Sequence, residues 1–152
     1  MAEINKDDCF VVKGKLALPY QYFAGRMGSR FIIALRDRKK ITGVRCERCD
    51  RVFVPPRQTC EGCQGDLSEA WVDLDDTGTV TGFTVIRYKE PHQPCEPPYI
   101  LALVQLDGAD TPLVHIVRGI EPEAMEVGLR VKAVFADQTT STIMDISHFA
   151  PA

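Results

Sequence analysis

The clearest helical pattern in the chain lies in residues 19–40, where apolar side chains recur at intervals of three and four positions. This spacing places them on one face of an α-helix. Gly25 and Gly28 weaken the first turns, because glycine has low helix propensity, and a break in the helix is expected near them. The sequence therefore predicts an amphipathic helix here, and most of its arginines lie off the apolar face. That face comprises Phe23, Met27, Phe31, Ala34 and Leu35.

Beyond residue 69, strand-like segments alternate with turn signals. Trp71-Val72-Asp73-Leu74 comes first, and a proline-rich loop, KEPHQPCEPP, later interrupts the series. The segment EPEAMEVG has room for one helical turn or a short helix. Five β-rich segments with a helical insertion fit the five-stranded oligonucleotide/oligosaccharide-binding (OB) barrel. The predicted barrel strands are TVTGFTVIRY, YILALVQL, LVHIVRG, RVKAVFA and STIMDISHF.

Four of the six cysteines stand in two Cys-x-x-Cys pairs, ten residues apart, with Pro55-Pro56 in the loop between them. Two such knuckles close a tetrahedral four-thiolate site, for which zinc is the default metal. An iron–sulfur cluster is the alternative, although the spacing is not typical of one. Four protein ligands leave no open coordination position, so one structural zinc per chain is expected. Its predicted ligands are Cys46, Cys49, Cys60 and Cys63.

The remaining thiols and imidazoles form no convincing catalytic group. Cys95 and His92 share the proline-rich loop, but a flexible loop is poor geometry for a nucleophile and its base. His115 lies inside an apolar strand, which favours a hydrogen-bonded barrel residue over a ligand. We therefore predict no catalytic residue in this chain. The expected architecture is mainly β: an N-terminal arm and helix (1–40), a zinc ribbon (41–68) and an OB barrel (69–152).

Charge is distributed unevenly along the chain. Residues 1–63 carry a net charge of +6 and residues 64–152 carry −9. Within the basic part, residues 26–57 hold ten Lys/Arg and three acids. An apolar run long enough to cross a membrane and a signal-peptide pattern are both absent from the sequence, which predicts a cytoplasmic protein. In the reducing cytosol, paired cysteines favour a metal over disulfides.

The basic stretch predicts an anion site, and two ligand classes fit. One is the backbone of a single-stranded nucleic acid, which OB folds with zinc ribbons do bind. The other is a small molecule with phosphates at one end. The acidic barrel would repel a polyanion, and its aromatic residues are not interleaved with Lys/Arg as a stacking platform requires. The nucleic-acid-binding module therefore stays as the alternative hypothesis.

The order of the motifs resembles the family known as domain of unknown function 35 (DUF35). The matching stretches cover roughly residues 19–149: YQYFAGRMGSRFIIALRDRKKITGVRC before the first knuckle, VFVPPRQTC before the second, then Trp71-Val72, GTVTGFTVI, PPYILALVQLDGADTPLVH and VGLRVKAVF. The resemblance implies an N-terminal helical segment, a rubredoxin-like zinc ribbon and an OB fold. Some family members lack the metal cysteines, whereas this chain has all four.

The resemblance also implies a function. Such proteins accompany thiolases or related acyl-CoA enzymes as non-catalytic subunits and help to hold coenzyme A, whose phosphates favour Arg/Lys. We therefore expect a hetero-oligomer with a thiolase-like catalytic subunit and no independent activity. Among the subgroups, the chain is most similar to the small subunit of the thiolase that cleaves benzoylsuccinyl-CoA in anaerobic toluene degradation. The predicted coenzyme A-binding residues are Arg26, Arg30, Arg45 and Arg57.

Overall fold

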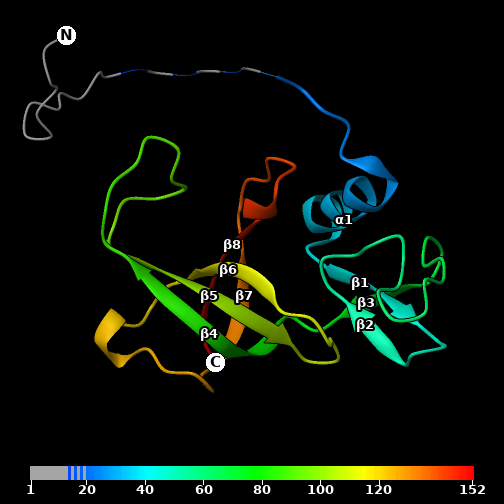
Figure 1. The fold of residues 1–152 in the computed structure, drawn as a ribbon. Coiled ribbons are helices and arrows are strands. Elements are labelled where there is room, and N and C mark those ends of the chain that lie inside the picture. Colours follow the sequence, from blue (N-terminus) through cyan, green and yellow to red (C-terminus); the bar gives the residue numbers. More distant parts are fainter. Residues whose placement is uncertain (1–13, 15, 17, 19) are drawn as a thin grey trace, which may run out of the picture.

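The computed structural model describes residues 14, 16, 18 and 20–152. It contains one α-helix, a three-stranded sheet and a closed five-stranded barrel (Figure 1). The predicted mainly β architecture is therefore confirmed. The possible strand or arm over residues 10–18 lies almost wholly outside the described residues. Among the described residues, no helix is long and apolar enough to span a membrane.

Helix α1 (Gly25–Arg38) is shorter than the predicted helix. Its C-terminal end is well capped: Lys39 adopts a left-handed conformation, and its N–H donates to the Leu35 carbonyl at 3.2 Å. Phe31, Ala34 and Leu35 are buried, as predicted.

The prediction was wrong for Phe23, whose side chain is 82% exposed. Gly25 has a φ of +73° and lies between Phe23 and the first full turn, so the chain changes direction before the helix begins. Phe23 therefore does not follow the apolar face of α1.

The ribbon sheet has the strand order β2–β1–β3. Strands β1 (Ile41–Cys46), β2 (Arg51–Phe53) and β3 (Trp71–Leu74) are antiparallel. The expected division of the chain placed β3 after the ribbon, but β3 pairs with β1, and Val44 lies opposite Trp71.

The free edge of β2 is joined to the turn between β5 (Tyr99–Leu106) and β6 (Leu113–Val117). Val52 and Asp110 exchange two hydrogen bonds, of 2.7 and 2.8 Å. The Thr111 hydroxyl accepts from the Val54 N–H and donates to the Val54 carbonyl, at 2.8 and 2.9 Å. These contacts satisfy backbone groups that an edge strand would otherwise leave unpaired.

The barrel has the strand order β4–β5–β6–β8–β7, and β4 closes it by pairing with β7. The parallel β6–β8 pair, with Val117 opposite Phe149, completes the OB connectivity. A 3₁₀ helix, η2 (Pro122–Ala124), occupies the predicted helical insertion, and η3 (Ile143–Asp145) precedes the last strand. The strands are β4 (Thr77–Ile86), β5 (Tyr99–Leu106), β6 (Leu113–Val117), β7 (Arg130–Phe135) and β8 (Ile146–Pro151).

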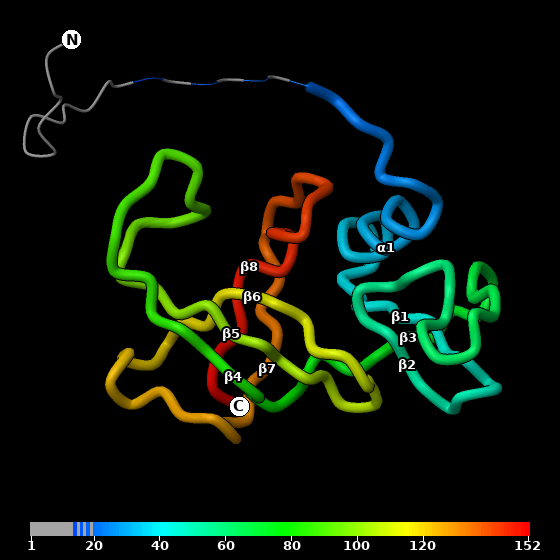
Figure 2. Tube along the Cα trace, in the orientation of Figure 1, coloured from blue at the N-terminus to red at the C-terminus, as the bar shows by residue number. Residues whose placement is uncertain are grey.

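One hydrophobic core connects the three parts. Phe31 and Leu35 of α1 and Ile41 of β1 belong to the same buried cluster as the barrel interior. Figure 2 shows α1 and the ribbon side by side at one end of the barrel. The three segments therefore share one core. The domain boundaries at residues 40 and 68 remain a prediction from the sequence. Barrel residues in the cluster include Val80, Val104, Leu106, Val131 and Phe149.

His115 is a buried barrel residue, as predicted. Its Nδ1 accepts from the Ile116 N–H at 2.9 Å, and its Nε2 lies 3.3 Å from the Ile143 carbonyl oxygen. Burial lowers the pKa of His115, because the charged imidazolium loses its hydration there. The arrangement fits a neutral ring that carries its proton on Nε2.

Candidate metal centre and the cleft beside α1

The four predicted metal-ligating cysteines lie together in the ribbon. Cys46 ends β1, and Cys49 follows in the turn before β2; the second knuckle lies in the loop between β2 and β3. The Sγ atoms all lie within 4.8 Å of one another. Two of the separations are 3.5 Å (Cys46–Cys63) and 3.8 Å (Cys49–Cys60). A tetrahedron with Zn–S bonds of about 2.3 Å has edges of about 3.8 Å, so the arrangement fits zinc.

The four thiols interact closely with one another. Backbone N–H donors, above all that of Cys63, lower the pKa of Cys60 to about 6. Hydrogen bonding with Cys63 and Cys60 raises the pKa of Cys49 to about 12. Four thiolates at these separations would crowd negative charge into one place. A divalent metal would neutralise that charge, and its four protein ligands would leave no position for water or substrate.

A charged cluster supports the second knuckle. Glu61, between Cys60 and Cys63, accepts hydrogen bonds from Arg51 at 2.6 Å and from Arg57 at 2.8 Å. Both guanidinium groups lie over the buried Phe53 ring, 5.1 and 4.7 Å from its centroid. Arg57 thus contacts the ribbon's own side chains, and it serves first to hold the knuckle against β2.

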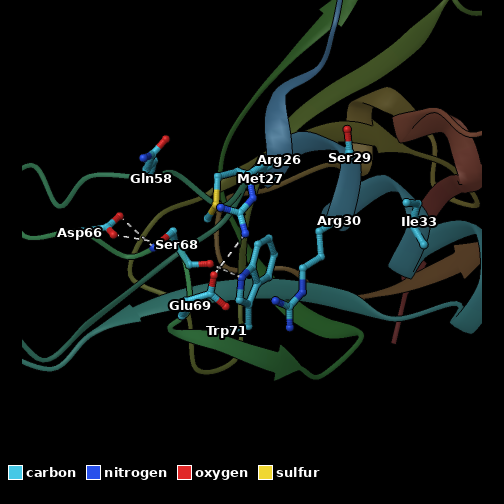
Figure 3. Close-up of a pocket in the computed structure, with 10 residues that line it drawn as sticks. All are labelled: Arg26, Met27, Ser29, Arg30, Ile33, Gln58, Asp66, Ser68, Glu69 and Trp71. Carbon is cyan, nitrogen blue, oxygen red and sulfur yellow. Dashed lines mark hydrogen bonds and ion pairs between the residues drawn. The ribbon is translucent and has the colours of Figure 1, made fainter.

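A cleft of about 490 Å³ lies between α1 and the ribbon (Figure 3). The Arg30 guanidinium lies over the Trp71 indole, 4.4 Å from the ring centroid, and Arg26 forms a 3.4 Å ion pair with Glu69. The Trp71 Nε1–H donates to the Ser68 carbonyl at 2.7 Å, which fixes the indole. The other lining residues are Met27, Ser29, Ile33, Gln58 and Asp66.

The four predicted coenzyme A-binding arginines do not form a single patch. Arg26 and Arg30 share the cleft, whereas Arg57 lies at the second knuckle. Arg45 pairs with Asp50 and lines a separate hollow that also contains Asp73 and Asp75. Counting basic residues along the chain could not reveal this separation, because it depends on which way each strand face points.

Sequence reasoning missed Trp71 as a site residue, although it placed Trp71 in a strand and among the residues that match the family. Two signals could have identified it: it is the single tryptophan of the chain, and it follows the second knuckle closely. Tryptophan is also the side chain on which a guanidinium stacks best. Its place beneath Arg30 makes it the apolar floor of the cleft.

A four-cysteine ribbon joined to a five-stranded OB barrel defines the chain as a zinc-ribbon/OB-fold protein. Two family models match accordingly: "ChsH2, rubredoxin-like zinc ribbon domain" over residues 34–68 and "ChsH2, C-terminal OB-fold domain" over residues 71–136. A DUF35 domain-containing scaffold protein of Methanothermobacter thermautotrophicus is 30% identical over 65% of this chain and 74% of its own length. The chain belongs to the DUF35 family.

Other relatives extend this picture. A DUF35 domain-containing scaffold protein of Methanocaldococcus jannaschii is 28% identical over 66% of this chain and 71% of that protein. A probable enoyl-CoA hydratase alpha subunit of Thermomonospora curvata is 34% identical over 57% of this chain, but the match spans only 26% of that protein.

Two solved structures share the fold. One is a chain of the Ltp2-ChsH2(DUF35) aldolase, with a TM-score of 0.61 and 27% identity over 82% of this chain and 93% of that one. The other is a DUF35 protein of unknown function from Sulfolobus solfataricus, with a TM-score of 0.58 and 28% identity over 72% of this chain and 78% of that one.

Proposed function

We propose that this protein is a non-catalytic accessory subunit of an acyl-CoA enzyme and helps a larger catalytic subunit to bind coenzyme A or an acyl-CoA. The names of its relatives support this: scaffold proteins, the Ltp2-ChsH2(DUF35) aldolase and a probable enoyl-CoA hydratase subunit. The metal site supports it as well, because four thiolate ligands would make the zinc structural. A four-cysteine ribbon therefore supplies a framework, and the bond-making residues belong to the partner.

The observation that carries the proposal is Arg30 over Trp71 in the cleft. No ion pair within 4.0 Å joins Arg30 to a described carboxylate; its guanidinium rests on the indole ring instead. It is therefore available to a phosphate, which guanidinium groups bind through paired N–H donors. The pyrophosphate and 3′-phosphate of coenzyme A are such groups. We assign the primary contact with the coenzyme A phosphates to Arg30, with Arg26 beside it.

The proposed partner is a thiolase-type subunit that cleaves or forms a C–C bond next to a thioester. The more specific candidate is benzoylsuccinyl-CoA thiolase of anaerobic toluene degradation. In either complex, the nucleotide end of coenzyme A would lie on this chain and the pantetheine arm would reach the partner's active site. Zinc and coenzyme A would then act separately, the first within the ribbon and the second at the shared surface.

The outer face of the barrel argues against the nucleic-acid alternative. On an OB fold, this face over the second and third strands binds oligonucleotides. Here a hollow across β4, β5 and β6 is lined by Gly82, Phe83, Thr84, Leu101, Ala102, Leu103 and Val114, without a cation. Single-stranded nucleic acid requires basic residues along its backbone, so the acyl-CoA proposal is preferred.

The first experiment is purification of the tagged full-length chain from its native host, with mass spectrometry of the bound proteins. The proposal expects an acyl-CoA enzyme, in its specific form a thiolase, at a fixed ratio to the chain. Recovery of ribosomal or replication proteins without an acyl-CoA enzyme would overturn it in favour of the nucleic-acid module.

The second experiment tests the cleft in the purified complex. Replacing Arg30 by Ala should weaken coenzyme A binding about tenfold or more, because a hydrogen bond to a charged group contributes about 1.5–3 kcal/mol. Isothermal titration calorimetry measures this. Arg87→Ala is the matched control: Arg87 pairs with Glu123 outside the cleft, and its removal should change the affinity less than about twofold. Equal affinities for the Arg30→Ala complex and the unaltered complex would contradict the assignment.

A further inference from the structure

The segment that precedes α1 exposes an unusual amount of apolar surface. Residues 16–23, which we call the arm, contain five large apolar side chains that keep more than two thirds of their surface exposed. Single exposed apolar residues are common on proteins, but a continuous group of them marks an interaction site. The exposed fractions are Leu16 84%, Leu18 68%, Tyr20 77%, Tyr22 78% and Phe23 82%.

Four of these residues are spaced for an extended chain. Leu16, Leu18, Tyr20 and Tyr22 occupy alternate positions, and alternate side chains of an extended backbone point to the same side. The described residues before Gly25 form neither helix nor strand, and Figure 1 shows residues 20–24 leading away from α1. The Tyr20 and Tyr22 rings lie 5.9 Å apart between centroids, as expected for neighbours on one side. An extended arm would therefore present these four side chains along one apolar edge.

Charge restricts what can cover that edge. Residues 13–23 contain two basic residues, Lys13 and Lys15, and no acid, although the whole chain is net negative. A complementary surface is therefore an apolar groove bordered by carboxylates. Extended peptides with alternating apolar side chains bind such grooves, often by adding a strand to an exposed sheet edge.

We propose that the arm is a docking segment that binds in an apolar, acid-bordered groove on the acyl-CoA-binding catalytic subunit. This rests on the proposed function. The cleft that would hold the coenzyme A phosphates must face the catalytic subunit, because the rest of the cofactor enters that subunit's active site. The arm ends at Phe23, three residues before Arg26 in the cleft lining. The arm and the cleft therefore belong to the same interface.

The test measures association of the full-length chain with the recombinant catalytic subunit, once the purification described above has identified it. Replacing Leu16, Leu18, Tyr20 and Tyr22 by Ser should weaken the complex at least about thirtyfold by biolayer interferometry, since buried aromatic anchors dominate interface affinity. The chain itself should keep its thermal midpoint, because these side chains are exposed in it. An unchanged affinity would overturn the inference.

Two controls make the result specific. Tyr88→Ser with Val127→Ser removes exposed apolar surface from the barrel, and Gln21→Ser changes a polar position of the arm; both should leave the affinity within about twofold. Sedimentation of the chain alone tests another occupant: a dimer that the four-serine variant dissociates would assign the arm to a second copy and contradict the proposal.

The arm and the cleft can fail independently. When the four-serine chain is saturated with catalytic subunit, coenzyme A affinity should return to that of the unaltered complex. Loss of coenzyme A binding only in the Arg30→Ala complex would then support the assignment of the cleft to coenzyme A. The role of the arm would be decided separately, by the affinity of the chain for the catalytic subunit. The purified partner could also prove to have no acyl-CoA activity and still bind the four-serine chain more weakly than the unaltered chain. That result would support the docking role of the arm and overturn the proposed function.

Discussion

His115 illustrates at the scale of one residue how burial fixes a protonation state. Burial removes the hydration of a charged imidazolium, and this holds the folded pKa of His115 below the value of about 6.5 expected in the unfolded chain. The neutral ring is held in place by the Ile116 N–H, which donates to its Nδ1. The unfolded chain takes up a proton first as pH falls, and the stabilising contribution of the neutral ring, complete above about pH 6.5, is lost below it.

We predict that the thermal midpoint decreases between about pH 7.5 and about pH 5.5, and that His115→Leu reduces this decrease. Differential scanning calorimetry at the two pH values measures it. His92→Gln, which removes an exposed imidazole from the 87–98 loop, is the control and should retain the full decrease. An identical pH dependence in the His115→Leu variant would contradict this explanation.

At the same scale, cysteines were far easier to predict than arginines. Cys46, Cys49, Cys60 and Cys63 can act together only if two knuckles face each other, and the Cys-x-x-Cys spacing already forms each knuckle. Arginine has no comparable restriction, because its long side chain can pair with any nearby carboxylate. Arg45 forms an ion pair with Asp50, and Arg57 forms one with Glu61. The spacing of the residues in the sequence does not predict these pairs.

At the scale of the element, the ribbon depends on its metal. Its own buried cluster is small and contains two of the ligands, Cys46 and Cys60, beside Val44, Phe53 and Leu67. In small zinc domains the binding of the metal supplies much of the folding free energy, with apparent values of about 10–16 kcal/mol for zinc-finger peptides. Loss of one ligand therefore removes both a packed side chain and most of the metal affinity.

We predict that Cys60→Ser abolishes stoichiometric zinc binding and lowers soluble yield. Elemental analysis of freshly purified protein should find one zinc per unaltered chain and well below half that amount in the variant. Cys95→Ser, which removes a thiol outside the cluster, should retain zinc and yield. A stable Cys60→Ser chain that still associates with its partner would count against a structural metal.

At the scale of the whole molecule, α1 connects the ribbon to the barrel. Leu35 is fully buried in the core shared by all three parts, while Ile33, on the same helix, is 47% exposed in the cleft. We predict that Leu35→Ala lowers the free energy of unfolding by about 2–5 kcal/mol, and that Ile33→Ala changes it by about 0.5 kcal/mol or less. Urea unfolding followed by tryptophan fluorescence measures both.

The shared core also predicts that ribbon and barrel unfold together. Fluorescence reports Trp71 in the ribbon, and far-UV circular dichroism reports mainly the barrel strands. For the unaltered chain and for Leu35→Ala the two urea transitions should coincide. Two separate transitions would show that the parts are independent and that the core between them contributes little.

The sequence by itself determined the elements with strong local signals: the helix stripe, the two knuckles and the five barrel strands. Each follows from interactions between residues close in the chain, or from a pattern that only one fold accommodates. The glycines at 25 and 28 indicated a break near the start of α1, but the sequence did not place it at Gly25, because a glycine in a sequence does not reveal the sign of its φ.

Only the tertiary structure decided where β3 pairs, which arginines share a cleft and what lies beneath them. Trp71 reaches Arg30 because β3 joins the edge of β1 and α1 crosses the same face of the ribbon. These contacts join residues about forty positions apart. Their formation depends on how the helix, ribbon and barrel bury a common core, and no local pattern encodes that packing.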